Sequence, residues 1–313
     1  MRIVSFLPSA TEMVCALGLG DHLVGITHEC DYPPEVQSRP VVVHSAVETK
    51  GVSSQQIDEA VSQRLRSGES LYVVDETLLR KLSPELILTQ DLCQVCAPSG
   101  HEIERVLKFL PQPPRILWLT PTCLQDIFEN IRQVGEATGR SAEATALLRQ
   151  LQGRVQAVAD RARRLPSRPR VFCMEWLAPP YSAGHWMPEL VELAGGVDGL
   201  ASKGRDSSRL AWERILDYAP EILILSPCGF HLNEVLRQAP LLTRYPEWER
   251  LPAVKAGRVY AVDANSYFAR PGPRIVEGLE LLAALLHPEE FHWSGPPEAY
   301  RALQGQDLTK EAG

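Results

Sequence analysis

The chain has 313 residues, of which 44% are hydrophobic and 23% charged, as is typical of a folded globular protein. At roughly 150 residues per domain, this length predicts two domains. The net charge of -7 argues against nucleic acid as the main partner, because a phosphate-binding surface usually makes a domain basic. No apolar run reaches about 18 residues, so we expect no membrane insertion.

The first residues and the number of cysteines are informative about the subcellular localisation of the protein. Met1 and Arg2 lead directly into a short apolar run that ends at Pro8, which has the length of a strand and not of a secretory signal. Seven cysteines cannot all pair within one chain, which argues against a disulfide framework. The chain as it stands therefore predicts a cytoplasmic protein. If a leader sequence has been removed from the chain, we expect a periplasmic or extracellular protein instead.

Short apolar runs alternate with helical patterns along the chain. The first helix is expected to begin at a capping box formed by Ser9 and Glu12 and to end at Gly18. Alternation of strands and helices predicts a mainly parallel α/β fold. Buried strands are expected at residues 2–6, 71–74, 86–89, 115–119, 171–174, 222–225 and 259–262.

Two segments of the chain are similar to each other. Residues 82–89 and 218–226 each read as a helix end, a Pro-Glu turn and a strand. Between them, apolar residues recur at spacings of three and four over 141–164, which predicts one helix of about 36 Å. We therefore expect an N-terminal α/β lobe over 1–140, a linking helix over 141–166 and a C-terminal α/β lobe over 167–313.

Several blocks carry a family resemblance: 2–12, 24–34, 83–88, the linking helix, 179–184 and 269–274. With these blocks the chain resembles the helical-backbone (class III) substrate-binding proteins of ABC transporters, most closely the cobalamin-binding members. The resemblance implies two Rossmann-like lobes joined by one long helix, and a small-molecule ligand in the cleft between them. It also implies that the protein is not an enzyme and that an ABC transporter permease is a partner.

Candidate ligand-binding residues follow the predicted strands, because ligands of open α/β sheets lie outside the carboxyl ends of the strands. A broad, partly apolar ligand such as a corrin needs aromatic walls and a few polar groups. Each ring could instead fill the core or brace a turn. The candidates are Tyr32, Trp176, Tyr181, His185, Trp186, Tyr267, Phe268 and Arg270.

Two of these candidates have polar side chains with specific alternatives. The imidazole of His185 could coordinate the cobalt of a corrinoid, or it could bond to backbone at the start of a helix. Arg270 could meet a phosphate or carboxamide rim, or it could form a salt bridge at the sheet surface.

Cys93 and Cys96 form a Cys-x-x-Cys pair after the strand at 86–89. The two sulfurs could share one metal ion, form a redox pair, or be buried as small apolar groups. A closed zinc site needs further ligands from distant segments, such as Glu175 and His185.

The leading hypothesis is a corrinoid-binding protein, for cobalamin or a precursor, in an ABC uptake system or as a cytoplasmic relative of such a protein. One alternative is a metal-dependent cytoplasmic protein that holds zinc or iron at Cys93 and Cys96. Another is a siderophore- or haem-binding protein of the same fold. Catalytic signatures such as Gly-x-Ser-x-Gly, His-Glu-x-x-His or a P-loop lysine motif are absent from the sequence.

Overall fold

The computed structural model describes residues 1–49, 51–90, 103, 107–108 and 110–308. The chain divides into two compact units. The first comprises Met1–Val52, Gln56–Pro121 and Gln125–Gln150. The second comprises Ser53–Gln55, Thr122–Leu124 and Leu151–Gly313. The main division falls inside helix α6 (Ser141–Ala162), which confirms the single helix predicted in the middle of the chain.

The first unit contains a six-stranded sheet in the order β4-β3-β2-β1-β5-β6. All neighbours pair in parallel except β3 and β4, so the predicted mainly parallel sheet is confirmed. Every residue of β1 and β5 is buried, as expected of central strands covered on both faces. The strands are β1 (Ile3–Ser5), β2 (Leu23–Thr27), β3 (Val41–Ser45), β4 (Tyr72–Val74), β5 (Leu86–Thr89) and β6 (Arg115–Trp118).

The first helix corrects one expectation from the sequence. It starts at Pro8, with Leu7 as the residue before it and no side-chain cap, so the predicted capping box of Ser9 and Glu12 is wrong. Proline is favoured at the first helical position, and here it moves the start ahead of Ser9. The helices of this unit are α1 (Pro8–Ala16), η1 (Gly20–His22), η2 (Pro34–Ser38), α2 (Ser54–Ser67), α3 (Glu76–Leu82) and α5 (Leu124–Thr138).

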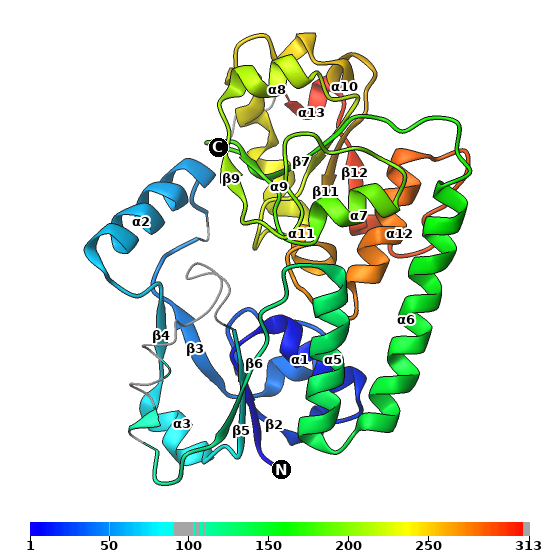
Figure 1. The fold of residues 1–313 in the computed structure, drawn as a ribbon. Coiled ribbons are helices and arrows are strands. Elements are labelled where there is room, and N and C mark those ends of the chain that lie inside the picture. The colour runs from blue at the N-terminus through cyan, green and yellow to red at the C-terminus, as the bar shows by residue number, and fades with distance from the viewer. Residues whose placement is uncertain (50, 91–102, 104–106, 109, 309–313) are drawn as a thin grey trace. The chain divides into compact units, whose positions relative to one another are not determined.

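The second unit contains a six-stranded sheet in the order β12-β11-β10-β7-β8-β9. Its centre is parallel, because β10 pairs in parallel with both β7 and β11. Strands β7, β9, β11 and β12 of this sheet are labelled in Figure 1. Antiparallel strands extend both edges. The strands are β7 (Val171–Trp176), β8 (Tyr181–Ser182), β9 (Ser208–Arg209), β10 (Ile222–Leu225), β11 (Val259–Val262) and β12 (Tyr300–Ala302).

Helix α12 is the most buried helix of the second unit and packs against α7. The later part of α6 is tied to α12 by Arg154, whose Nε and Nη2 donate to the Glu280 carboxylate at 2.8 and 2.6 Å. Among the described residues, no helix is both long and apolar enough to cross a bilayer. The helices are α7 (Met187–Leu193), α8 (Trp212–Tyr218), α9 (Leu232–Gln238), η3 (Ala239–Arg244), η4 (Trp248–Arg250), α10 (Pro252–Lys255), α11 (Ala264–Tyr267), α12 (Ile275–Leu286), η5 (Pro297–Ala299) and α13 (Gly305–Leu308).

The similarity between residues 82–89 and 218–226 is also structural. Helix α3 ends at Ser83 and helix α8 at Ala219, and both residues are left-handed, with φ of 47° and 49°. The left-handed residue ends each helix, and the Pro-Glu turn then leads into β5 or β10. The two units therefore use the same helix-to-strand connection.

An arginine completes this connection in both units. The backbone N–H of Arg2 donates to the Glu85 carboxylate at 2.7 Å, and that of Arg170 donates to Glu221 at 2.9 Å. Each arginine also donates through Nε to the carbonyl of the left-handed residue, at 2.7 and 3.1 Å. The repeated contacts indicate that the two units are variants of one plan.

Candidate ligand-binding site

The carboxyl ends of β7, β10 and β11 lie side by side in the second sheet, because the three strands are parallel neighbours. Trp176 ends β7, and Phe230 lies in the loop after β10. Their ring centroids are 5.2 Å apart at an interplanar angle of 57°. Phe230 is buried and Trp176 is half-buried. Part of the Trp176 indole ring is therefore exposed at this edge of the sheet, and the ring packs against Phe230.

A polar network adjoins this pair. The Nδ1 of His231 lies 3.1 Å from both carboxylate oxygens of Asp263, and its Nε2 lies 3.1 Å from the Asn265 side-chain nitrogen. Asp263 also accepts from the backbone N–H and the hydroxyl of Ser266, at 2.9 and 3.0 Å. The backbone N–H of Asn265 donates to the carbonyl of Phe230 at 3.1 Å. The network thus connects the loop after β10 to the turn after β11.

A half-buried carboxylate, that of Glu175, organises a third group at this edge. Glu175 accepts from the Ser207 hydroxyl at 2.6 Å and from the Gly184 backbone N–H at 3.2 Å. Burial raises the pKa of Glu175 above its ordinary value, and these two hydrogen bonds act in the opposite direction. Close packing requires a glycine at position 184, because a Cβ there would lie 2.4 Å from the Ser207 backbone nitrogen.

His185 belongs to the same group. It has a φ of 52°, unusual for a residue with a side chain, and its backbone N–H donates to the Arg205 carbonyl at 2.6 Å. Its side chain is 14% exposed, and Nε2 lies 3.2 Å from a carboxylate oxygen of Asp206. The backbone bonds hold this strained conformation next to Trp186, whose ring centroid is 5.5 Å from the imidazole.

Tyr181 lies on β8 and is half-buried. It pairs with Trp176 across β7 and with Arg209 across β9. The Arg209 guanidinium carbon lies 5.7 Å from the centre of the tyrosine ring, within the range of a cation–π contact. Trp176 and Tyr181 are therefore neighbours in the sheet.

The other predicted ligand residues of this unit are largely covered by protein. Trp186 is 7% exposed, and its indole N–H donates to the Phe268 carbonyl at 2.9 Å. Tyr267, Phe268 and Arg270 are 6%, 3% and 5% exposed. Burial raises the pKa of Tyr267 to about 12. In the described state these four side chains contribute mainly to packing beneath the edge.

Tyr32 lies in the first unit, in the loop after β2, and is 44% exposed. The same loop is joined to α1 by Cys30, whose sulfur lies 3.0 Å from the Thr11 hydroxyl. Tyr32 is thus the most exposed of the predicted aromatic residues.

The predicted metal residues Cys93 and Cys96 lie outside the described residues. Glu175 lies close to His185, because Glu175 accepts from the backbone N–H of the adjacent Gly184 at 3.2 Å. Within the described part of the chain, no group of three or more histidine, cysteine or carboxylate side chains could hold a metal ion.

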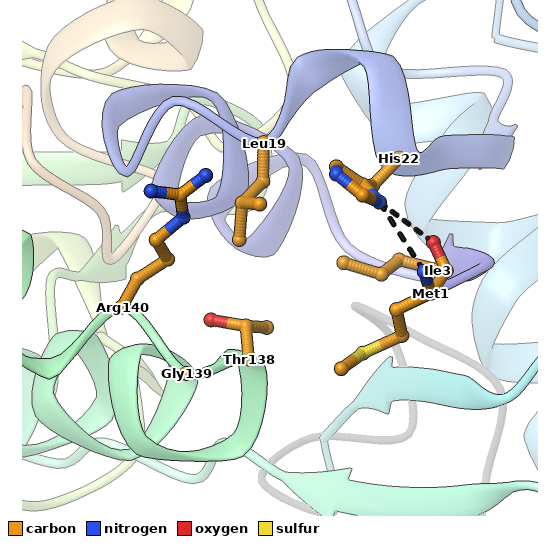
Figure 2. Close-up of a pocket in the computed structure, with 7 residues that line it drawn as sticks. All are labelled: Met1, Ile3, Leu19, His22, Thr138, Gly139 and Arg140. Carbon is orange, nitrogen blue, oxygen red and sulfur yellow. Dashed lines mark hydrogen bonds between the residues drawn. The ribbon is translucent and has the colours of Figure 1, made fainter.

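A separate pocket of about 330 Å³ lies at the amino end of the first sheet, where Ile3 begins β1. Figure 2 shows His22 reaching the Met1 backbone at one side of it. The imidazole Nδ1 lies 2.9 Å from the Met1 carbonyl oxygen. The pocket is on the wrong edge of the sheet for the expected ligand. Its lining consists of Met1, Ile3, Leu19, His22, Thr138, Gly139 and Arg140.

The network of His231, Asp263 and Asn265 was not among the residues predicted from the sequence. All three lie in segments that follow predicted strands: Asp263 comes directly after β11, Asn265 lies in α11, and His231 lies six residues after the end of β10. That signal alone did not distinguish them from the other residues of these segments. The contacts among these three residues form because β10 and β11 are paired in the sheet. The distance between residues along the sequence does not predict which strands pair.

The chain thus consists of two compact α/β units, the first built on a mainly parallel sheet and the second on a mixed sheet with a parallel centre. The family model described as periplasmic binding protein matches residues 3–266. The chain belongs to the periplasmic binding protein family.

Individual relatives cover nearly the whole chain. An uncharacterized ABC transporter substrate-binding lipoprotein, YvrC, of Bacillus subtilis is 25% identical over 93% of this chain and 81% of its own length. The vitamin B12-binding protein of Vibrio cholerae is 23% identical over 91% of this chain and 88% of its own. A periplasmic haem-binding protein from Pseudomonas aeruginosa has the same fold, with a TM-score of 0.71 at 18% identity over 92% and 93% of the two chains.

Proposed function

We propose that this protein binds a corrinoid, either cobalamin or a cobalamin precursor, as the substrate-binding protein of an ABC uptake system. Membership of the periplasmic binding protein family supports the binding role, and the relative named for vitamin B12 supports the choice of ligand. The observation on which the proposal depends is the edge of the second sheet. There, half-buried Trp176 and Tyr181 belong to the same carboxyl edge as the partly exposed His231.

The chemistry of that edge suits a corrinoid. A corrin presents a broad, partly apolar face, which an indole and a phenol ring can cover at about 25 cal/mol per Å² of apolar surface removed from water. Its rim carries carboxamides, which need both hydrogen-bond donors and acceptors. The amide of Asn265 and the carboxylate of Asp263 offer both kinds of group beside the rings.

The partner follows from the proposed role. A substrate-binding protein delivers its ligand to a membrane permease, and the name of the Bacillus subtilis relative supports an ABC transporter here. We therefore propose a permease as the macromolecular partner and a small molecule as the ligand.

Isothermal titration calorimetry with cyanocobalamin tests the proposal. We expect saturable binding of one ligand per chain at concentrations of about tens of micromolar or below. Replacing Tyr181 with alanine should weaken binding about tenfold, because covering an aromatic ring contributes about 1.5 kcal/mol or more. The matched control is Tyr218→Ala, since Tyr218 is also half-buried but bonds to Val197 beside the start of β7.

Haemin and a ferric siderophore provide the competing arms of the same titration. Tight binding of haemin without any heat from cyanocobalamin or hydroxocobalamin would contradict the corrinoid proposal. It would assign the chain to the ligand class of the Pseudomonas aeruginosa protein instead.

A further inference from the structure

Trp176 is held by a hydrogen bond from outside its own sheet. Its indole N–H donates to the backbone carbonyl of Ser54 at 3.0 Å, while its ring packs against Phe230. Ser54 is the first residue of α2, and together with Ser53 and Gln55 it belongs to the second unit. The Trp176 ring is therefore held at two points, by a ring contact at the sheet edge and by a carbonyl at the start of a helix.

Ser54 is held in turn by Gln238, which ends α9. The backbone N–H of Ser54 donates to the side-chain oxygen Oε1 of Gln238 at 2.6 Å. Both residues are buried, with 0% and 2% of their surface exposed. Two hydrogen bonds thus connect the Gln238 side chain, through the backbone of Ser54, to the indole of Trp176.

We propose that Gln238 is a positioning residue of the ligand site, which fixes the orientation of the Trp176 indole through the backbone of Ser54. In this role Gln238 acts through its neighbour and not by contact with the ligand. This inference rests on the proposed function for the identity of the ligand. It adds the residue that sets the orientation of one aromatic wall.

The start of α2 explains why the path depends on Gln238. The first N–H groups of a helix have no partner inside the helix. The N–H of Ser54 is buried, so leaving it without an acceptor would cost the free energy of removing it from water. When Gln238 supplies no acceptor, the start of α2 must open to let water reach this N–H. The carbonyl that holds the indole then moves as well.

The benefit to binding is an indole that is ordered before the ligand arrives. Trp176 is half-buried, so without the Ser54 carbonyl its ring can turn about the side-chain bonds. Ordering a mobile side chain on binding weakens affinity by about two- to tenfold. A ring that is already held avoids this loss.

Three substitutions isolate the acceptor. Gln238→Met removes it with little change in side-chain length, because a thioether accepts only weakly. Gln238→Glu keeps an oxygen acceptor at the same place in the side chain. Gln133→Met is the matched control: Gln133 is a half-buried glutamine that bonds to Glu129 within its own helix α5, at 3.2 Å.

Fluorine NMR of protein labelled with 5-fluorotryptophan reports the environment of the indole without any ligand. The chain has six tryptophans, and the resonance lost in Trp176→Phe is that of Trp176. We expect this resonance to shift or broaden in Gln238→Met and to keep its position in Gln238→Glu and Gln133→Met. If Gln238→Met lowers stability but leaves the resonance in place, Gln238 only caps α2 and the proposal is overturned.

Calorimetric titration with cyanocobalamin gives the second readout. Gln238→Met should weaken binding about two- to tenfold, and Gln238→Glu should restore it. In the Trp176→Phe background no indole N–H remains, so Gln238→Met should weaken binding by less than about twofold, because both changes break the same path. Equal losses in the two backgrounds would overturn the proposal.

Exchange of the indole N–H in the unsubstituted protein keeps the test independent of whether the variants fold. The N–H of Trp176 donates to a carbonyl of a fully buried residue. It should therefore exchange with D₂O more slowly than the indole N–H of Trp118, whose residue is 38% exposed. Exchange as fast as that of Trp118 would show that the indole is not held, against the proposal.

The outcomes separate this inference from the proposed function. Cyanocobalamin binding with an unmoved Trp176 resonance overturns the role of Gln238 and leaves the corrinoid proposal standing. A Trp176 resonance that moves in Gln238→Met, in a protein that binds haemin but no corrinoid, overturns the corrinoid proposal and supports the positioning role. The affinities of the variants are then compared with haemin.

Discussion

Asp198 is a buried carboxyl group whose ionisation should lower the stability of the second unit. Its Oδ1 accepts from the backbone N–H groups of Leu200 and Ala201 at 3.0 and 3.2 Å. Burial nevertheless dominates and raises its pKa from 3.8 to about 6. A pKa difference of about 2 corresponds to about 3 kcal/mol of free energy.

The sign of the effect follows from linkage. Below about pH 4 the Asp198 carboxyl is protonated in both the folded and the unfolded state, and above about pH 6 it is ionised in both. Between these values the unfolded state loses its proton first, so the free energy of unfolding falls by about 3 kcal/mol as the pH rises.

The substitution Asp198→Asn keeps a carbonyl acceptor and removes the titration. We expect the variant to gain about 3 kcal/mol relative to wild type on going from pH 4 to pH 7. Urea unfolding followed by tryptophan fluorescence measures this, because five of the six tryptophans lie in the second unit and only Trp118 lies in the first. Asp217→Asn, on the exposed face of α8, is the control that should show no such gain.

The comparison with wild type at each pH removes the contribution of other carboxyl groups. Glu175 also has a raised pKa, and its effect has the same sign, but it is present in both proteins. The reasoning is refuted if Asp198→Asn and wild type differ by the same amount at pH 4 and pH 7. It is also refuted if the variant is the less stable protein at pH 7.

Two further predictions concern the backbone. Gly184→Ala should lower the free energy of unfolding by about 1–3 kcal/mol, because its Cβ would lie 2.4 Å from the Ser207 backbone nitrogen. Gly153→Ala in α6 should raise the free energy of unfolding by about 0.5–1 kcal/mol, because its Cβ would have no atom within 4 Å and alanine favours the helix. Ser83→Gly and Ala219→Gly should each gain about 1 kcal/mol, because both residues are left-handed at φ of 47° and 49°. Calorimetric melting temperatures measure both, and equal values for Gly184→Ala and Gly153→Ala would contradict the first.

The strands that the sequence predicted best are those covered on both faces. Residues 86–89, 222–225 and 259–262 are strands with the predicted bounds, because a continuous apolar run of that length indicates a central parallel strand. Strand β3, of five residues, was not predicted, and neither were β8, β9 and β12. Strands β8, β9 and β12 are two or three residues long and lie toward the edges of the second sheet, where one covered face leaves little hydrophobic signal.

For the candidate site, the sequence identified which residues follow strands but not how they are used. Trp176 and Trp186 look alike in the sequence, and each donates its indole N–H to a backbone carbonyl, yet Trp176 is half-buried at the carboxyl edge while Trp186 is only 7% exposed. The contact of His231 with Asp263 joins residues 32 positions apart. Hydrophobic pattern determines which residues leave water, since it acts through each residue and its near neighbours. Which side chains then meet is decided by the order of strands in the sheet, a long-range property that only the tertiary structure contains.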